Sequence, residues 1–218
     1  MGALSEGSVV TGKVKYFSSD WMVGLGFQNY EDWLNDLVDN GQHWVDIYKE
    51  CPIPSPAWLI SREEFDGCGA FNSERLPEDY DLCFRFYAAG LQINAVDELV
   101  HLWRDSQNRT SRKLPIYFPM AYDPLKLHYF LSLEQDSSKQ LILWGAGTKG
   151  KRIAKMLLDS QVEFLWITNN QQKIGVDIYG QMLLGEPEVK LDDAQTVIGV
   201  ASPDALVPLK SMRVSVAR

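Results

Sequence analysis

The sequence has little that would mark a secreted, membrane-spanning or zinc-binding protein. Its three cysteines, Cys51, Cys68 and Cys83, are odd in number and far apart, which fits neither a zinc motif nor a disulfide framework. We therefore expect reduced thiols and a cytoplasmic location. No apolar run reaches the roughly 18–20 residues that a membrane-spanning helix needs, and the N-terminus lacks the pattern of a signal peptide.

Positive charge is also scarce. The chain has 21 lysines and arginines against 29 aspartates and glutamates, a formal net charge of −8. A general nucleic-acid binder carries a basic surface, so we expect no nucleic acid among the partners. What the chain does have is apolar content, since 45% of its 218 residues are hydrophobic. That is enough to bury a sizeable core, in one large domain or two smaller ones.

The first part of the chain alternates between strand and helix patterns. The β-branched alternation of residues 8–17 predicts a strand, and the apolar spacing of residues 30–38 predicts a helix that Gly41 ends. Three prolines in residues 52–56 predict a rigid loop entering a short strand at 58–60. Ser61 and Glu64 have capping-box spacing for a short helix. A further helix is expected at about 78–89, and one or two strands at 92–104.

The second part begins after a polar loop expected around residues 104–115. Asp123 and Pro124 predict the start of a helix that ends near Gln135. After a linker at 135–140, the pattern gives a strand at 141–144, a glycine turn, a helix at 151–160, and strands at 162–167 and 196–201. This order predicts a βαβ unit with a parallel sheet and helices on its faces. We therefore expect two α/β domains, residues 1–135 and 139–218.

Three carboxylates, Glu78, Asp79 and Asp81, crowd the start of the helix predicted at 78–89. The simplest interpretation is capping, because the helix macrodipole stabilises such a carboxylate by about 0.3–1 kcal/mol. The alternative is catalytic, since a helix N-terminus keeps Asp79 ionised and able to accept a hydroxyl proton. Consecutive helical residues point about 100° apart, so one of Glu78 and Asp79 can face a substrate while the other holds a loop or a sugar.

A second candidate cluster lies further along the chain, where His101 and Arg104 follow an apolar strand. A neutral imidazole can ligate a divalent metal, and a guanidinium can pair with a phosphate through two hydrogen bonds. A lone histidine at a strand end is more often structural. The same holds for each of Trp44, Trp58 and Trp103, although Trp58 beside the proline loop is the best candidate to stack on a sugar.

The run from "CPIPSPAWLI" through "EDYD" to "HLWR" resembles the second half of a family 2 glycosyltransferase of the GT-A fold. The resemblance covers about residues 8–112. It implies a nucleotide-sugar donor, a divalent metal (Mn or Mg), and transfer of a hexosyl or N-acetylhexosaminyl group to a glycan or other hydroxyl acceptor with inversion. The roles it implies are general base for Asp79 with Glu78 beside it, substrate contacts for Trp58, Asp81 and Arg104, and a metal contact for His101.

Inverting transfer is a single displacement that needs one base at the acceptor and cationic help for the leaving diphosphate. The chain departs from the family at its start, where the nucleotide-binding portion and an Asp-x-Asp metal loop should precede residue 8. The only Asp-x-Asp here is Asp79-Tyr80-Asp81. We interpret it as the base motif, and we expect the isolated chain to turn over little or no nucleotide sugar.

Gly145, Gly147 and Gly150 form a G-x-G-x-x-G turn between a predicted strand and a predicted helix. That context favours a phosphate at the helix N-terminus, with Lys149 adding charge. The acidic residue that usually holds an NAD ribose is absent, since residues 168–170 are Thr-Asn-Asn. Residues 139–205 resemble the small Rossmann-like domains that accompany sugar-modifying enzymes and end some family 2 glycosyltransferases. This implies nucleotide or nucleotide-sugar binding, or docking alone.

Two alternatives stay open. The glycine turn could serve an NAD(P)-dependent oxidoreductase, against which the missing acidic anchor counts. The chain could also be a non-catalytic module for sugar binding, nucleotide binding or assembly. In that case an open sheet edge would favour a homo-oligomer.

Overall fold

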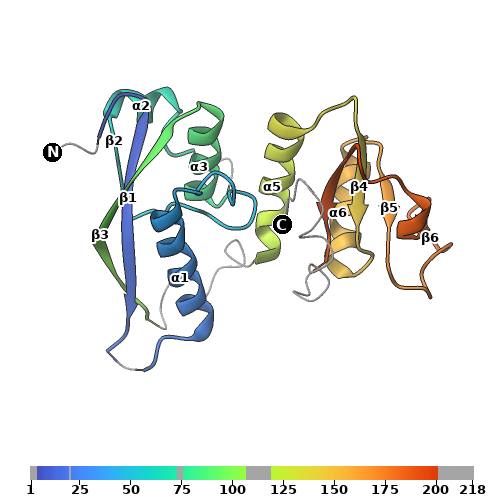
Figure 1. Cartoon of the computed structure of the whole chain (residues 1–218), viewed down its shortest axis with the longest axis horizontal. Coiled ribbons are helices and arrows are strands. Elements are labelled where there is room, and N and C mark those ends of the chain that lie inside the picture. The colour runs from blue at the N-terminus through green and yellow to red at the C-terminus, as the bar shows by residue number, and fades with distance from the viewer. Residues whose placement is uncertain (1–3, 20, 73–75, 107–118, 201–218) are drawn as a thin grey trace. The chain divides into compact units, whose positions relative to one another are not determined.

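The computed structural model of the chain describes residues 4–19, 21–72, 76–106 and 119–200. The chain divides into two compact units, Met1–Leu125 and Lys126–Arg218, so the boundary falls inside helix α5 (Asp123–Tyr129), ahead of the predicted linker. Each unit combines helices with a sheet of its own (Figure 1). The predicted mixed α/β class is confirmed at this level.

The first unit is built on a three-stranded sheet in the order β2-β1-β3. The central strand β1 (Ser8–Phe17) pairs antiparallel with β2 (Trp58–Ile60) and parallel with β3 (Gln92–Arg104). The strands predicted at 8–17 and 58–60 are confirmed, and residues 92–104 form one strand.

A bulge interrupts the pairing of β1 with β3, because the register shifts on both sides of Lys13. The extra residues of β3 lie over Gly12. A Cβ there would meet the Val100 Cγ1 atom at 2.6 Å and the Glu98 carbonyl oxygen at 3.0 Å. Gly12 therefore admits the bulge because it has no side chain.

Two helices, α1 (Leu25–Asn40) and α3 (Glu78–Ala88), lie on the same side of this sheet (Figure 1). Leu34 of α1 packs with Val14 of β1 in one core cluster. The helix predicted to end at Gly41 does so, with Gly41 in the left-handed region at a φ of 63°.

The short helix α2 (Arg62–Gly67) also lies where the sequence predicts it. The Ser61 side chain accepts a hydrogen bond from the Glu64 N–H at 3.1 Å, which is one half of a capping box. The Glu64 carboxylate accepts from the Ser61 hydroxyl at 2.8 Å and from the Gly7 N–H. It therefore ties α2 to the start of β1.

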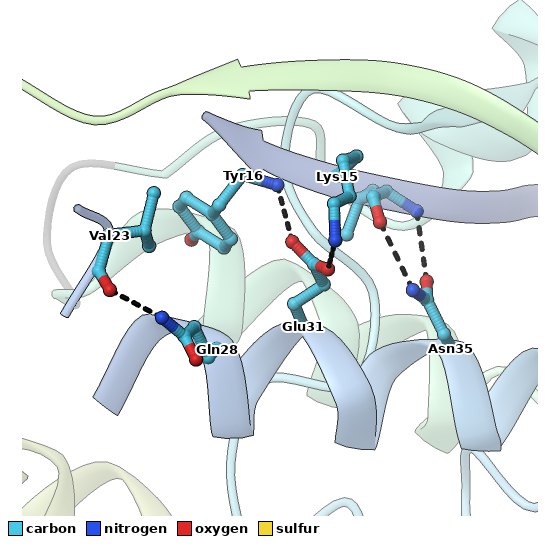
Figure 2. A network of polar contacts seen from close by, with 7 residues as sticks. Lys15, Tyr16, Val23, Gln28, Glu31 and Asn35 are labelled. Carbon is cyan, nitrogen blue, oxygen red and sulfur yellow. Dashed lines mark hydrogen bonds and ion pairs between the residues drawn. The ribbon is translucent and has the colours of Figure 1, made fainter. Parts of the chain in front are cut away.

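Side chains of α1 close one edge of β1 where β2 no longer pairs with it (Figure 2). The Asn35 side chain accepts from the Val14 N–H at 3.0 Å and donates to the Val14 carbonyl at 3.1 Å, as a neighbouring strand would. Glu31, only 5% exposed, accepts from the Tyr16 N–H at 2.5 Å and pairs with the Lys15 ammonium at 2.6 Å. This stretch of edge is therefore already satisfied and does not invite another strand.

The second unit holds a five-stranded sheet in the order β6-β7-β5-β4-β8. Its strands are β4 (Gln140–Trp144), β5 (Leu165–Ile167), β6 (Asp177–Ile178), β7 (Gln181–Leu184) and β8 (Ala194–Ile198). Strands β4, β5, β7 and β8 run parallel, as the βαβ pattern predicts. The sheet also has one antiparallel edge strand that was not predicted, because β6 pairs antiparallel with β7 in a hairpin. Helix α6 (Thr148–Asp159) follows β4.

The helix predicted from Asp123 to Gln135 is present in two forms, α5 and a π-helical segment at Phe130–Glu134. Short 3₁₀ turns lie at Pro119–Tyr122 and Glu186–Glu188. Most of the loop predicted around 104–115 lies outside the described residues. Within the part of the chain that the structure describes, no helix is both long and apolar enough to cross a membrane.

Candidate functional site

Helix α3 carries the three predicted carboxylates in its first turn, directly after Pro77. The Asp79 Oδ1 atom accepts a hydrogen bond from the Tyr80 N–H at 2.8 Å. The Glu78 Oε2 atom is buried and has no hydrogen-bond partner among the described residues. Helix α3 has no side-chain cap on its N-cap residue Pro77, so this local hydrogen bond accounts for one oxygen of Asp79 and leaves Glu78 unexplained.

Asp81 is used by the fold. It is 1% exposed, and its Oδ2 atom accepts from the Arg85 Nε atom, one turn later on α3, at 2.9 Å. Arg85 also donates to the Cys68 carbonyl, so the ion pair fixes α3 to the segment after α2. A carboxylate in this position stabilises the packing, whereas the substrate contact predicted for it would need an exposed group.

Asp79 is half-buried, and its environment makes it more basic than an ordinary aspartate. Burial, and then the nearby charge of Glu78, raise the pKa of the Asp79 carboxyl, although the hydrogen bond from the Tyr80 N–H acts in the opposite direction. From the sequence, we expect the helix N-terminus to have the largest effect on the pKa of Asp79 and to keep the carboxylate ionised. Burial outweighs it, and a higher pKa improves a carboxylate as a proton acceptor.

Tyr30, which was not among the predicted site residues, is affected by the charge of Asp79. Burial raises the pKa of the Tyr30 phenol, and the charges of Cys51, Glu50, Tyr16 and Asp79 raise it further. The Tyr30 hydroxyl donates to the Cys51 carbonyl at 2.8 Å. Helix α1 and the start of the proline loop therefore meet at Tyr30, and Asp79 is near enough to affect the pKa of its phenol. Tyr30 and Asp79 are far apart in the chain, so no local spacing could have shown it.

His101 and Arg104 lie on β3, away from direct contact with the α3 carboxylates. The His101 ring packs edge-on against Trp103 with centroids 5.8 Å apart, and Trp103 stacks on Tyr16 of β1 at 4.9 Å. Arg104 is exposed at the end of β3, level with Phe17 at the end of β1. No hydrogen bond or ion pair within the described ranges joins these two residues to the first turn of α3.

The residues described do not by themselves make the predicted metal site. No group of three or more His, Cys, Asp and Glu side chains among them is placed to hold a metal ion. A divalent cation takes several protein ligands or a bound phosphate to share it, and His101 supplies one nitrogen.

Trp58 belongs to an aromatic cluster with one side open to solvent. Its ring centroid lies 5.9 Å from Phe65, 6.2 Å from Phe71 and 5.9 Å from Phe86 of α3. Phe86 is buried, while Phe71 is 51% exposed. The cluster therefore presents an aromatic surface, which suits the apolar face of a sugar ring.

The glycine turn between β4 and α6 is largely explained by close packing. A Cβ on Gly150 would lie 1.9 Å from the Gly145 carbonyl oxygen, and one on Gly199, just after β8, would lie 2.7 Å from the Gly150 Cα atom. Gly145 has a φ of 117° and no room for a Cβ beside Val200. Gly147 is different, because nothing lies within 4 Å of its Cβ position and its φ is −81°.

Two carbonyl oxygens of the turn accept hydrogen bonds from side chains of the second unit. The Trp166 indole donates to the Gly145 carbonyl at 2.8 Å, and the Lys173 ammonium donates to the Ala146 carbonyl at 2.8 Å. Lys149 is half-buried in the first turn of α6. The turn thus combines the N–H groups of a helix start with nearby lysines, the chemistry that binds a phosphate.

No protein-family model matches the chain, and a search of curated proteins finds no match either.

Proposed function

We propose that the first unit is the acceptor side of an inverting, GT-A-type glycosyltransferase in which Asp79 is the general base. The observation that carries this proposal is the contrast within one helical turn. Asp81 is buried in an ion pair, whereas Asp79 is half-buried, unpaired with any cation in the described residues, and has a raised pKa. A carboxylate of that kind is suited to accept a proton.

The reaction is one displacement at the anomeric carbon. The acceptor oxygen forms a bond to that carbon, the bond from the carbon to the nucleoside diphosphate breaks, and the hydroxyl proton passes to Asp79. The Glu78 side chain is half-buried, so its carboxylate is the proposed contact for a sugar hydroxyl beside the base. The aromatic side of the Trp58 cluster is the proposed platform for the acceptor glycan.

Arg104 is the proposed contact for the leaving diphosphate, which gains negative charge as the bond breaks. Strands β1 and β3 are parallel, and ligands of α/β folds bind beyond the carboxyl ends of such strands, where Arg104 lies. His101, three residues earlier on the same strand, is the proposed ligand for a divalent metal that the diphosphate would share.

Binding of uridine diphosphate tests this assignment directly. We expect calorimetric binding that manganese strengthens and that Arg104→Ala weakens by about tenfold or more, as the loss of a charged hydrogen bond implies. Arg62→Ala is the matched control, because Arg62 is exposed and its one ion pair among the described residues is with Asp66, at 2.6 Å. If uridine diphosphate does not bind, or if both variants weaken it equally, the assignment of Arg104 is wrong.

Turnover is a separate matter. The only Asp-x-Asp of the chain belongs to the base motif. We therefore assign this chain the acceptor side of the reaction, and we expect little or no sugar transfer by the chain alone. Robust metal-dependent transfer by the chain alone would contradict that expectation. Loss of such transfer in Asp79→Asn would nonetheless support the base.

For the second unit we propose a Rossmann-like nucleotide or nucleotide-sugar site at the glycine turn. Two observations favour it: the strand order β7-β5-β4-β8, which is the 3-2-1-4 order of a dinucleotide-binding half, and the open space at Gly147. An NAD(P) enzyme is less favoured, since Thr168 replaces the acidic anchor and accepts from the Asn170 N–H at 3.2 Å. Energy transfer from tryptophan to bound NADH would revive that alternative.

An assembly role is the remaining candidate, and β3 is the observation that favours it. The outer edge of β3 has no strand partner in the described part of the chain, and Leu99 and Leu102 are 56% and 60% exposed. Such an edge favours pairing with a second copy. Light scattering at rising concentration tests it, and a monomer throughout counts against it.

A further inference from the structure

Two buried thiols lie in contact one helical turn from Asp79. The Sγ atoms of Cys51 and Cys83 are 3.6 Å apart, and both also point to the Ile53 carbonyl, at 3.4 and 3.8 Å. Cys83 is on α3, four residues after Asp79 and therefore on the same face of the helix. Cys51 begins the proline loop that leads to Trp58.

We propose that Cys51 and Cys83 are an oxidative modification site, at which a peroxide closes a disulfide that fastens the proline loop to α3 and a thiol reductant reopens it. The three cysteines are all free in the structure. Sulfur atoms in a disulfide are about 2.05 Å apart, so closure needs a movement of roughly 1.5 Å. Because Cys83 is held within α3 and the loop contains three prolines, this movement falls to rotation of the two cysteine side chains and a small shift of residues 51–57, which form no helix or strand.

The chemistry balances with hydrogen peroxide as the oxidant. The sulfur of one cysteine, as thiolate, attacks a peroxide oxygen, the O–O bond breaks, and a sulfenic acid and water form. The second thiol attacks the sulfenic sulfur, the S–O bond breaks, and a second water leaves. Two thiols lose two electrons and two protons in total, and one peroxide becomes two waters. A dithiol reductant reverses the result by thiol–disulfide exchange.

Burial sets the rate of this reaction. Both side chains are buried, and the hydrogen bond between the two thiols, together with burial, raises the pKa of Cys51 well above its usual value. The thiolate is the reactive form, so closure is slow at neutral pH and faster at alkaline pH. Hydrogen peroxide is small enough to reach a buried thiol through local opening of the loop, whereas bulky oxidants are not.

The third cysteine provides the control. Cys68 is half-buried, lies after α2, and has no sulfur neighbour in the described residues. A Cys68→Ser chain therefore retains only the proposed pair. We expect peroxide to convert it into a species lighter by two hydrogen atoms, with no thiol left for alkylation after denaturation and a peptide that joins Cys51 to Cys83. A dithiol should restore both thiols, and amide exchange at Cys51, Ile53, Ser55 and Ala57, the loop residues that carry an N–H, should be slower in the oxidised form.

Cys83→Ala on the same background separates this site from general oxidation. It should give no internal disulfide, and its Cys51 should stop at a sulfenic or sulfinic acid. The proposal is overturned if the Cys68→Ser chain keeps two alkylatable thiols after peroxide, or if it gains oxygen without losing the two hydrogens. It is also overturned if only disulfides between chains appear. Each readout is a mass, so the outcome does not depend on transferase activity.

Discussion

Each unit contains one candidate motif, the acidic turn of α3 in the first unit and the glycine turn before α6 in the second. In both motifs, packing requires some of the residues and does not require others. In the first unit, Asp81 is buried against Arg85 while Asp79 remains half-exposed and more basic than usual. In the second, Gly150 has a carbonyl oxygen where its Cβ would be, while Gly147 has open space. Within each motif, neighbouring residues therefore have different physical roles: Asp81 and Gly150 are needed for packing, whereas Asp79 and Gly147 are not. Those that packing does not require are the ones to test for function.

The largest effect is expected in the second unit, from Gly150→Ala. The new Cβ would lie 1.9 Å from the Gly145 carbonyl oxygen, a backbone atom that cannot move without disturbing the turn. We expect a loss of about 4 kcal/mol or more in the free energy of unfolding. Urea unfolding of the full chain, followed by tryptophan fluorescence to which the buried Trp144 and Trp166 of this unit contribute, measures it.

Gly147→Ser is the matched control for that variant. Serine is a good N-cap residue, and the φ of −81° and the open space accommodate it, so we expect no loss and a gain of up to about 0.5 kcal/mol. If both variants unfold the unit, the turn is a packing motif throughout. If Gly147→Ser is stable but weakens nucleotide binding, Gly147 is the functional member.

A smaller but still large effect is expected from Asp81→Asn in the first unit. The substitution leaves the guanidinium of Arg85, whose side chain is 18% exposed, without its carboxylate partner. Breaking such a buried pair costs about 3 kcal/mol. Thermal unfolding checks it, and Arg62→Ala, which removes an exposed pair with Asp66, should leave stability almost unchanged. Equal effects of the two would mean that Asp81 has no special structural role.

Local patterns explain why much of the fold could be predicted from the sequence. The strands at Ser8–Phe17 and Trp58–Ile60 follow from alternation and from the proline loop. The helix stops at Gly41 and Gly90 follow from glycine's access to the left-handed region, which both residues occupy. These signals involve neighbours in the chain, so no knowledge of tertiary contacts is needed.

The features that were missed depend on contacts between distant segments. Glu31 precedes Leu34 by three residues on α1 and therefore lies on the same buried face, so a buried acid could have been predicted there. Its partner, the Tyr16 N–H of β1, could not. The spacing of Asp81 and Arg85 also allowed an ion pair, although not its burial. The contact between Cys51 and Cys83 and the antiparallel strand β6 gave no local signal.

The next effect concerns another polar group of the first unit that the fold leaves without a partner. His43 is 1% exposed, and neither ring nitrogen has a hydrogen-bond partner among the described residues. Burial lowers the pKa of His43 from 6.5 to about 4. Between these pH values the unfolded chain binds a proton that the folded chain does not, so stability should fall by about 3 kcal/mol as the pH drops from 6.5 to 4.

The variant His43→Leu isolates the contribution of that imidazole. Leucine has no proton to bind, so the slope of stability against pH between 6.5 and 4 should decrease in the variant. Urea unfolding at half-unit steps of pH measures the slope. An unchanged slope would assign the acid sensitivity to other groups and would mean that His43 binds a proton equally well in the folded and the unfolded chain.

The smallest effect is the one that bears most directly on the proposed base. Asp79→Asn keeps an oxygen to accept from the Tyr80 N–H but removes a charge that burial and Glu78 disfavour. The folded-state pKa of Asp79 is above its ordinary 3.8, so the folded chain binds a proton more readily than the unfolded chain, and ionisation costs stability above the folded pKa. We therefore expect Asp79→Asn to stabilise the protein slightly at neutral pH. The gain should disappear as the pH falls below 3.8. A residue that costs stability and needs no partner in the fold is consistent with a catalytic role, whereas a destabilisation as large as that of Asp81→Asn would make Asp79 a second structural carboxylate.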